Sequence, residues 1–131
     1  MFKKNKEAKS INLNQQEIST LIGLGYEING EVTGKSVIRI DGKVNGNVTT
    51  EGGLILGDKG MIIGNVKTTS AIIYGTVSGN VEALQLEIKK TGIVNGDINT
   101  ETLEIELGAQ YNGNLKMKQM IKSEEKVLKA V

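Results

Sequence analysis

Apolar and polar residues alternate in short runs along most of the chain, and glycine-containing segments separate these runs. Within 38–48 and again within 71–81, one parity class contains only apolar residues and glycine. A period of two is typical of β-strands, whereas a helix needs apolar residues every three or four positions. Two further runs have the same period: Leu84, Leu86 and Ile88, then Leu103, Ile105 and Leu107. The pattern predicts short strands that keep the same face inside before and after each bend.

The chain also contains an internal repeat of the form apolar–x–Gly–polar–apolar. Its six central glycines are spaced 16, 18, 15, 17 and 17 residues apart: Gly30, Gly46, Gly64, Gly79, Gly96 and Gly113. Near-constant spacing of this length indicates a solenoid whose coils stack at the interstrand spacing of ~4.8 Å. The predicted fold class is all-β: a single-stranded parallel β-helix, or β-solenoid, of about six short coils.

Two features of the repeat bear on this interpretation. Asn-Gly pairs at 29–30, 45–46, 95–96 and 112–113 are also strong hairpin signals, so an antiparallel meander or barrel is the alternative. A hairpin does not require one face to continue in phase through every turn, so we favour the solenoid. The residue after each of the last five repeat glycines is Asn or Asp, and we expect these side chains to form amide hydrogen-bond ladders between coils: Asn47, Asn65, Asn80, Asp97 and Asn114.

Composition argues against most catalytic chemistry. The chain has no His and no Cys, so it lacks a triad base, a thiolate nucleophile and the usual zinc ligands. Left-handed β-helix acyltransferases and related carbonic anhydrases generally depend on His and repeat every six residues. This chain has neither feature, so these enzyme classes are disfavoured. Glu104 and Glu106 lie on an outward strand face without a cleft, and we interpret them as surface carboxylates. Acidic residues elsewhere are too scattered for a calcium loop. We therefore expect no enzyme activity, no metal and no cofactor.

Charge divides the chain into three parts. Residues 1–10 contain four Lys and one Glu, and residues 116–131 contain five Lys and two Glu, so each part has a net charge of +3, whereas 11–115 has a net charge of −5. A mildly acidic body with few aromatic residues is not expected to bind nucleic acid. We predict a flexible basic tail at 1–19, a solenoid at 20–117 and a tail at 118–131.

Two further predictions concern the location of the protein in the cell and its C-terminal tail. No stretch is apolar enough for a transmembrane helix or a signal-peptide core, which predicts a cytoplasmic protein. The tail has apolar residues at roughly helical spacing, and it could cap the last coil, lie on a membrane, bind a partner or be disordered.

Several stretches resemble the bactofilins, a family of bacterial cytoskeletal proteins. They are Leu21-Ile22-Gly23, the segment 25–30, the segment 40–46 and the segment 107–113, and the resemblance extends over about 20–117. It implies a right-handed parallel β-helix that assembles end to end into nonpolar filaments without nucleotide. It also implies a scaffold at the membrane that organises cell-wall enzymes, cell shape or polarity.

The resemblance assigns roles to two sets of residues. Family members often have Phe in the last coil where this chain has Tyr111, and that ring supports polymerisation. Many members begin with a short membrane-targeting segment of Met, a bulky apolar residue and Lys. Met1, Phe2, Lys3 and Lys4 are similar to that segment. The resemblance thus implies a cytoplasmic protein held peripherally at the inner face of the cell membrane.

A solenoid has two open ends, and each end exposes unpaired backbone groups and apolar filling. We expect the end coils to pair head to head and tail to tail, which gives a homopolymer without polarity. The predicted interface residues are Leu21, Ile22, Leu24 and Ile28 at one end, and Leu103, Ile105, Leu107, Tyr111 and Leu115 at the other. The alternative is a capped or co-assembling solenoid that recruits partners, such as a paralogue or cell-wall-remodelling enzymes, without forming its own filament.

Overall fold

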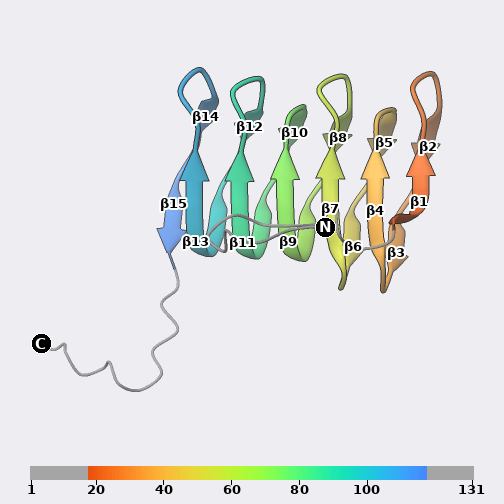
Figure 1. Cartoon of the computed structure of the whole chain (residues 1–131), viewed down its shortest axis with the longest axis horizontal. Helices are drawn as coiled ribbons and strands as arrows, with labels where there is room; N and C mark the ends of the chain where they lie inside the picture. The colour runs from red at the N-terminus through yellow and green to blue at the C-terminus, as the bar shows by residue number, and fades with distance from the viewer. Residues whose placement is uncertain (1–17, 118–131) are drawn as a thin grey trace, which may run out of the picture.

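The computed structural model describes residues 18–117, and within them it contains fifteen strands and no helix. Every strand pairing is parallel, and the chain winds into six coils stacked along one axis (Figure 1). This confirms the predicted solenoid. The segment Met1–Lys4 and the tail 118–131 lie outside the described residues, and no described helix is long and apolar enough to cross a membrane.

Each coil contributes three short strand segments. The first two coils contain β1 (Ile18–Ile22), β2 (Glu27–Asn29), β3 (Val32–Gly34), β4 (Val37–Ile40), β5 (Lys43–Asn45) and β6 (Val48–Thr50). The next two contain β7 (Gly53–Leu56), β8 (Met61–Ile63), β9 (Val66–Ile73), β10 (Thr76–Ser78) and the first half of β11 (Val81–Ile88). The last two contain the second half of β11, β12 (Ile93–Asn95), β13 (Ile98–Ile105), β14 (Gln110–Asn112) and β15 (Leu115–Met117).

The segments form two sheets that close a tube of three faces. One sheet has six strands in the order β14-β12-β10-β8-β5-β2 and makes one face. The other has nine strands and makes two faces, because the long strands β9, β11 and β13 continue around a corner. Thus the first half of β9 pairs with β6 and its second half pairs with β7.

The core is a set of in-register ladders that run the length of the tube. On the six-stranded sheet, the ladder is Ile28, Val44, Ile62, Val77, Val94 and Tyr111. The faces of the other sheet contribute Ile22, Ile40, Leu56, Ile73, Ile88 and Ile105, and then Val32, Val48, Val66, Val81, Ile98 and Leu115. The middle members of each ladder are fully buried, so the parity predicted for 38–48 and 71–81 is confirmed.

The predicted alternation fails at one corner. Leu84 was expected on the same face as Leu86 and Ile88, but it is 47% exposed while the other two are buried. The reason is the turn within β11, where Ala83 and Leu86 both point inward and the two residues between them form the corner. At the equivalent corner of β13, the Thr100 hydroxyl donates a hydrogen bond to the Thr102 carbonyl at 2.9 Å. Three-residue spacing therefore replaces period two at this corner.

The repeat glycines stack above one another at a second corner. Gly79 has φ +153°, and a Cβ built on it would lie 2.0 Å from the carbonyl oxygen of Gly64 in the preceding coil. A side chain there would require both a disfavoured backbone conformation and displacement of the neighbouring coil. Glycine thus permits the close coil contact that fixes the repeat.

The Asn ladder after these glycines has a different chemistry from the predicted one. The Asn65 side-chain oxygen accepts the backbone N–H of Asn80 at 3.0 Å, and the Asn80 side chain accepts that of Asp97 at 3.0 Å. Since only an acceptor oxygen is used, Asp can replace Asn at position 97. Amide-to-amide bonds occur instead before the glycine, where Asn112 Nδ2 donates to Asn95 Oδ1 at 2.9 Å.

Candidate polymerisation surfaces at the two end coils

The two end coils lack a stacked neighbour on one side within residues 18–117. Strands β1, β2 and β3 pair only with the second coil, while β14 and β15 pair only with the fifth coil. Half of the backbone donors and acceptors of an unpaired edge strand point away from the sheet. Each end of the tube can therefore accept a further parallel or antiparallel strand from another molecule.

The first coil presents a mixture of core and exposed apolar residues. Ile22 and Ile28 belong to the core ladders and are partly buried, because they pack against the second coil only. Leu21 is in register with Arg39 and Ile55, whose side chains point outward, so Leu21 lies on the outer surface. Leu24 is exposed in the turn between β1 and β2. Of the residues predicted at this end, only Ile22 and Ile28 fill the open tube.

The last coil places four of its five predicted residues over the core. Leu103 and Tyr111 are partly buried against the fifth coil, whereas Ile105 and Leu115 are 44% and 43% exposed at the end of their ladders. Leu107 follows β13 in a turn and is almost fully exposed. The apolar cross-section at this end is therefore formed by Leu103, Ile105, Tyr111 and Leu115.

Tyr111 is the largest side chain in its ladder, where it stacks on Val94. Its hydroxyl is buried and has no hydrogen-bond partner among the described residues. Burial raises the pKa of this hydroxyl, and the nearby Ile98 backbone lowers it by a smaller amount. The Ile98 backbone does not form a hydrogen bond with the hydroxyl. An unsatisfied buried hydroxyl destabilises a protein by about 1–3 kcal/mol. Tyr111 thus contributes apolar area at the end of the tube together with a polar penalty.

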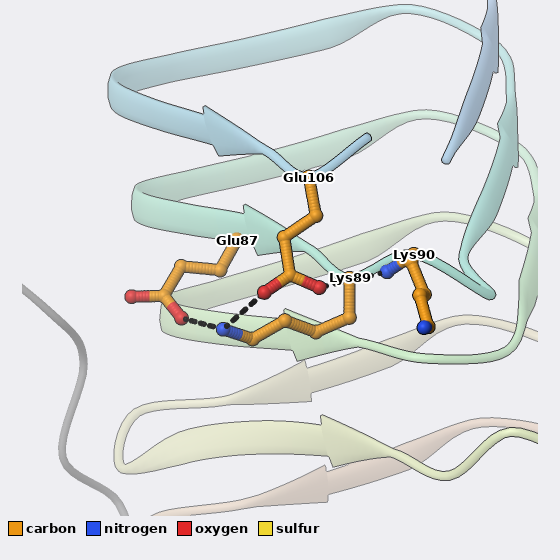
Figure 2. A network of polar contacts seen from close by, with 4 residues as sticks. All are labelled: Glu87, Lys89, Lys90 and Glu106. Carbon is orange, nitrogen blue, oxygen red and sulfur yellow. Dashed lines mark hydrogen bonds and ion pairs between the residues drawn. The ribbon is translucent and has the colours of Figure 1, made fainter. Parts of the chain in front are cut away.

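A network of charges lies beside the last coils, on the outer face (Figure 2). Lys89 Nζ is 3.0 Å from Glu87 and 3.7 Å from Glu106, and the Lys90 backbone N–H donates to Glu106 at 3.0 Å. Burial alone would lower the pKa of Lys89, but the hydrogen bond and charge of Glu87, with the charge of Glu106, raise it. Glu106 therefore ties the sixth coil to the fifth, and no cluster of three or more potential metal-binding acids occurs within 18–117.

Sequence reasoning missed one apolar surface. Val37, Ile55 and Ile72 form a cluster separate from the core, on the outer side of the nine-stranded sheet. The signal was present, because each lies in a run that is apolar at both parities, such as Leu54-Ile55-Leu56. Continuous apolar runs are typical of strands that are covered on both faces.

These features define a class of protein: a parallel β-solenoid with two open apolar ends. The family model described as polymer-forming cytoskeletal, Bactofilin, matches residues 20–116. The chain belongs to the bactofilin family, which is a structural cytoskeletal family, and this confirms the resemblance noted in the sequence.

Three comparisons give the extent of the similarity. The chain is 31% identical over 111 residues to bactofilin BacP of Myxococcus xanthus, covering 84% of this chain and 46% of BacP. It thus spans about half the length of that relative. Among solved structures, double helical filaments of Thermus thermophilus bactofilin match with a TM-score of 0.69 and 32% identity, over 73% of this chain and 98% of that one. Cytoskeletal bactofilin BacA matches with a TM-score of 0.69 and 33% identity, over 76% and 96%.

Proposed function

We propose that this protein is a non-enzymatic scaffold that polymerises end to end, without nucleotide and without filament polarity. The observation that carries the proposal is the pair of open coils. The core ladders terminate there, with Ile22 and Ile28 in the first coil and Ile105 and Leu115 in the last coil. Stacking a second molecule there would pair the edge strands and bury these side chains. Assembly of this kind continues the fold, so it needs no bound nucleotide.

Membrane attachment is the second part of the proposal. Met1 and Phe2 would insert into the lipid surface, while Lys3 and Lys4 would contact anionic headgroups at ~1 kcal/mol each. A single segment of this size binds weakly and reversibly. A filament carries many copies, so avidity would convert weak binding into stable attachment at the inner face of the membrane. A membrane-bound filament could then position cell-wall enzymes or determine cell shape.

The first experiment tests polymerisation. The full-length protein is pelleted at high speed without nucleotide and imaged by negative-stain electron microscopy, beside Tyr111→Arg and a control, Leu84→Arg. Leu84 is an exposed apolar residue at a corner of the middle of the tube, so arginine there should leave filaments unchanged. We expect filaments from the native protein and from Leu84→Arg only. A native protein that stays soluble at every concentration would contradict the proposal.

The second experiment tests polarity, with Tyr111→Arg at one end and Ile28→Arg at the other. Two like-to-like interfaces predict that each variant alone forms dimers through its intact end, and that a mixture contains only these homodimers. A head-to-tail filament predicts the reverse, because each variant alone would be monomeric and the mixture would form a heterodimer. Analytical ultracentrifugation, with a fluorescent label on one variant, separates these outcomes. Circular dichroism checks that both variants remain folded.

A further inference from the structure

The apolar strip Val37, Ile55 and Ile72 is buried although it lies outside the tube. Their neighbours Ile38, Leu54 and Ile73 point into the core, so the strip residues point away from it. Yet Val37, Ile55 and Ile72 are only 2%, 4% and 8% exposed. All fifteen strands within 18–117 belong to the wall of the tube, and none forms a second layer over this face (Figure 1). The low exposure therefore favours a cover that the described strands do not provide.

Charge varies along the same face in a defined order. Continuing from β7 through β9 and β11 to β13, the outward ladder reads Ile55, Ile72, Glu87 and Glu104. Glu106 lies beside Glu87 in the network with Lys89 (Figure 2). In the second coil the same ladder position is Arg39, which pairs with Asp41. The ladder is thus apolar in the third and fourth coils and carries carboxylates in the fifth and sixth, where Lys89 pairs with Glu87.

The segment before β1 carries apolar residues and positive charges in an order that matches the apolar and acidic parts of this face. Ile11 and Leu13 are its apolar pair nearest to Ile18, and four lysines, Lys3, Lys4, Lys6 and Lys9, precede them. The strip lies one to three strands from β1, or ~5–14 Å along the tube, and Glu87 and Glu104 lie ~19–24 Å away. Leu13 is five residues from Ile18 and can reach about 17 Å, while the lysines can reach at least about 30 Å. Both contacts are therefore within reach of one extended segment.

We propose that residues 1–17 dock on the outer face of the nine-stranded sheet, with Ile11 and Leu13 against the apolar strip and the lysines against Glu87 and Glu104. The segment begins from β1, which is a strand of this same sheet. The tail 118–131 instead starts from β15 at the far end of the tube, on another face. A second copy of the solenoid would bring its acidic ladder against this one if it lay parallel, and against the apolar strip if it lay antiparallel; like-charge repulsion opposes the first and desolvation of the carboxylates opposes the second.

The test uses thiol accessibility, since the chain has no cysteine of its own. Ile72→Cys in the full-length protein places one thiol in the strip, and Thr49→Cys places one at an exposed position on another face. Maleimide labelling is measured for Ile72→Cys alone and combined with Ile11→Asp and Leu13→Asp. Docking predicts that the paired Asp substitutions raise the labelling rate of Ile72→Cys by at least about tenfold and leave Thr49→Cys unchanged.

A matched control uses Asn12→Asp with Asn14→Asp, which add the same charge at the alternate positions of the segment. These substitutions should leave the thiol protected, whereas a rate equal to that of the Ile11 and Leu13 variant would overturn the proposal. Fast labelling of Ile72→Cys in the chain with the native segment would also overturn the proposal. Protection that disappears on dilution would overturn it too, because it would indicate that a second copy covers the strip. Release by Val127→Asp with Leu128→Asp would assign the cover to the other tail. Circular dichroism verifies the fold of each variant.

Docking has a consequence that rests on the proposed membrane attachment. The lysines cannot contact the acidic ladder and anionic lipid at the same time, so vesicles containing phosphatidylglycerol should raise the labelling rate of Ile72→Cys, while phosphatidylcholine vesicles should not. Co-sedimentation reports membrane binding separately. Failure to sediment would contradict membrane attachment and leave docking to be judged by the Asp variants. Sedimentation with unchanged labelling would show that the two states are not exclusive.

Discussion

The fifth and sixth coils occupy the same positions of the repeat but have different environments. Ile88 in the fifth coil is fully buried, whereas Ile105, its register partner in the sixth, is 44% exposed. Ile98 and Leu115 differ in the same way, at 1% and 43%. All four are apolar residues of similar size, so the difference arises from the missing coil above the sixth. A side chain in this fold is buried by its neighbours along the axis, and the end surface is an interrupted core.

We expect the largest difference in the free energy of unfolding between Gly79→Ala and Gly30→Ala. A Cβ at Gly79 would meet the preceding coil at 2.0 Å, whereas one at Gly30, in the first coil, would have nothing within 4 Å. Both residues have positive φ. We expect Gly79→Ala to lower the free energy of unfolding by more than about 4 kcal/mol, and Gly30→Ala by only the conformational cost of about 1–3 kcal/mol. Urea denaturation in a background that carries both Tyr111→Arg and Ile28→Arg, in which neither end can pair, measures both.

Gly30→Ala also probes the polymer. Its Cβ would point out of the first coil, toward a molecule stacked on that end. In the otherwise native chain, we expect this variant to pellet poorly while remaining folded. Equal losses of stability at the two glycines would mean that coil contact does not set the requirement for glycine.

The next contrast compares Ile88→Ala with Ile105→Ala in the same background. Truncating a buried isoleucine destabilises a protein by about 2–5 kcal/mol, because burial is lost and a cavity remains. Ile88→Ala should fall in that range, and Ile105→Ala should cost less than half as much. The test is chemical denaturation followed by circular dichroism. In filaments, the difference should shrink, and an unchanged difference would argue against burial of Ile105 in the polymer.

A smaller contrast concerns the ladder of side-chain oxygens. Asn80 Oδ1 accepts the N–H of Asp97 in the next coil, whereas Asn114 lies in the last coil and no residue of the described chain stacks above it. Asn80→Ala should therefore cost about 1 kcal/mol, and Asn114→Ala close to none in the Tyr111→Arg background. Thermal unfolding can resolve the two. A comparable loss at Asn114 would show that its side chain has another role.

The smallest effect is expected for Tyr111→Phe, which keeps the ring and removes the unpartnered hydroxyl. We expect a gain of about 1 kcal/mol at neutral pH and filaments at least as stable as the native ones. The raised pKa of Tyr111 means that the folded state favours the protonated form. The preference for the protonated form contributes stability to the folded state. That contribution is complete below the ordinary tyrosine pKa of about 10, and it is lost as the pH rises through the higher pKa of the folded state.

The advantage of Tyr111→Phe should therefore grow in alkaline solution. Unfolding free energies measured between about pH 8 and 11 for the native and Phe chains give the comparison. Native stability that falls in parallel with the variant would remove Tyr111 as the source of the pH dependence.

The sequence predicted the coil number, the register and most of the core, because a repeat with glycine at fixed spacing places equivalent residues above one another. It did not predict Leu84 at a corner, since a two-residue bend shifts the phase and leaves no mark in the alternation. The ladder chemistry was also misjudged, although Asp97 within a row of Asn residues indicated that only an acceptor was needed. Of the predicted end residues, Leu21, Leu24 and Leu107 are apolar but lie outside the tube. Hydrophobicity alone cannot separate such positions from Ile22 or Ile105.

The uniform stacking of the six coils has a consequence for fibre diffraction. Every coil rises by the same interstrand distance, so aligned filaments built by end stacking should give a meridional reflection at ~4.8 Å, the spacing usually associated with amyloid. In amyloid each layer is a separate chain, and growth can add any copy to any end. Here six successive layers have different sequences on one chain, so the lattice is periodic in its backbone but not in its side chains. Registration between subunits is thereby restricted to the two terminal layers.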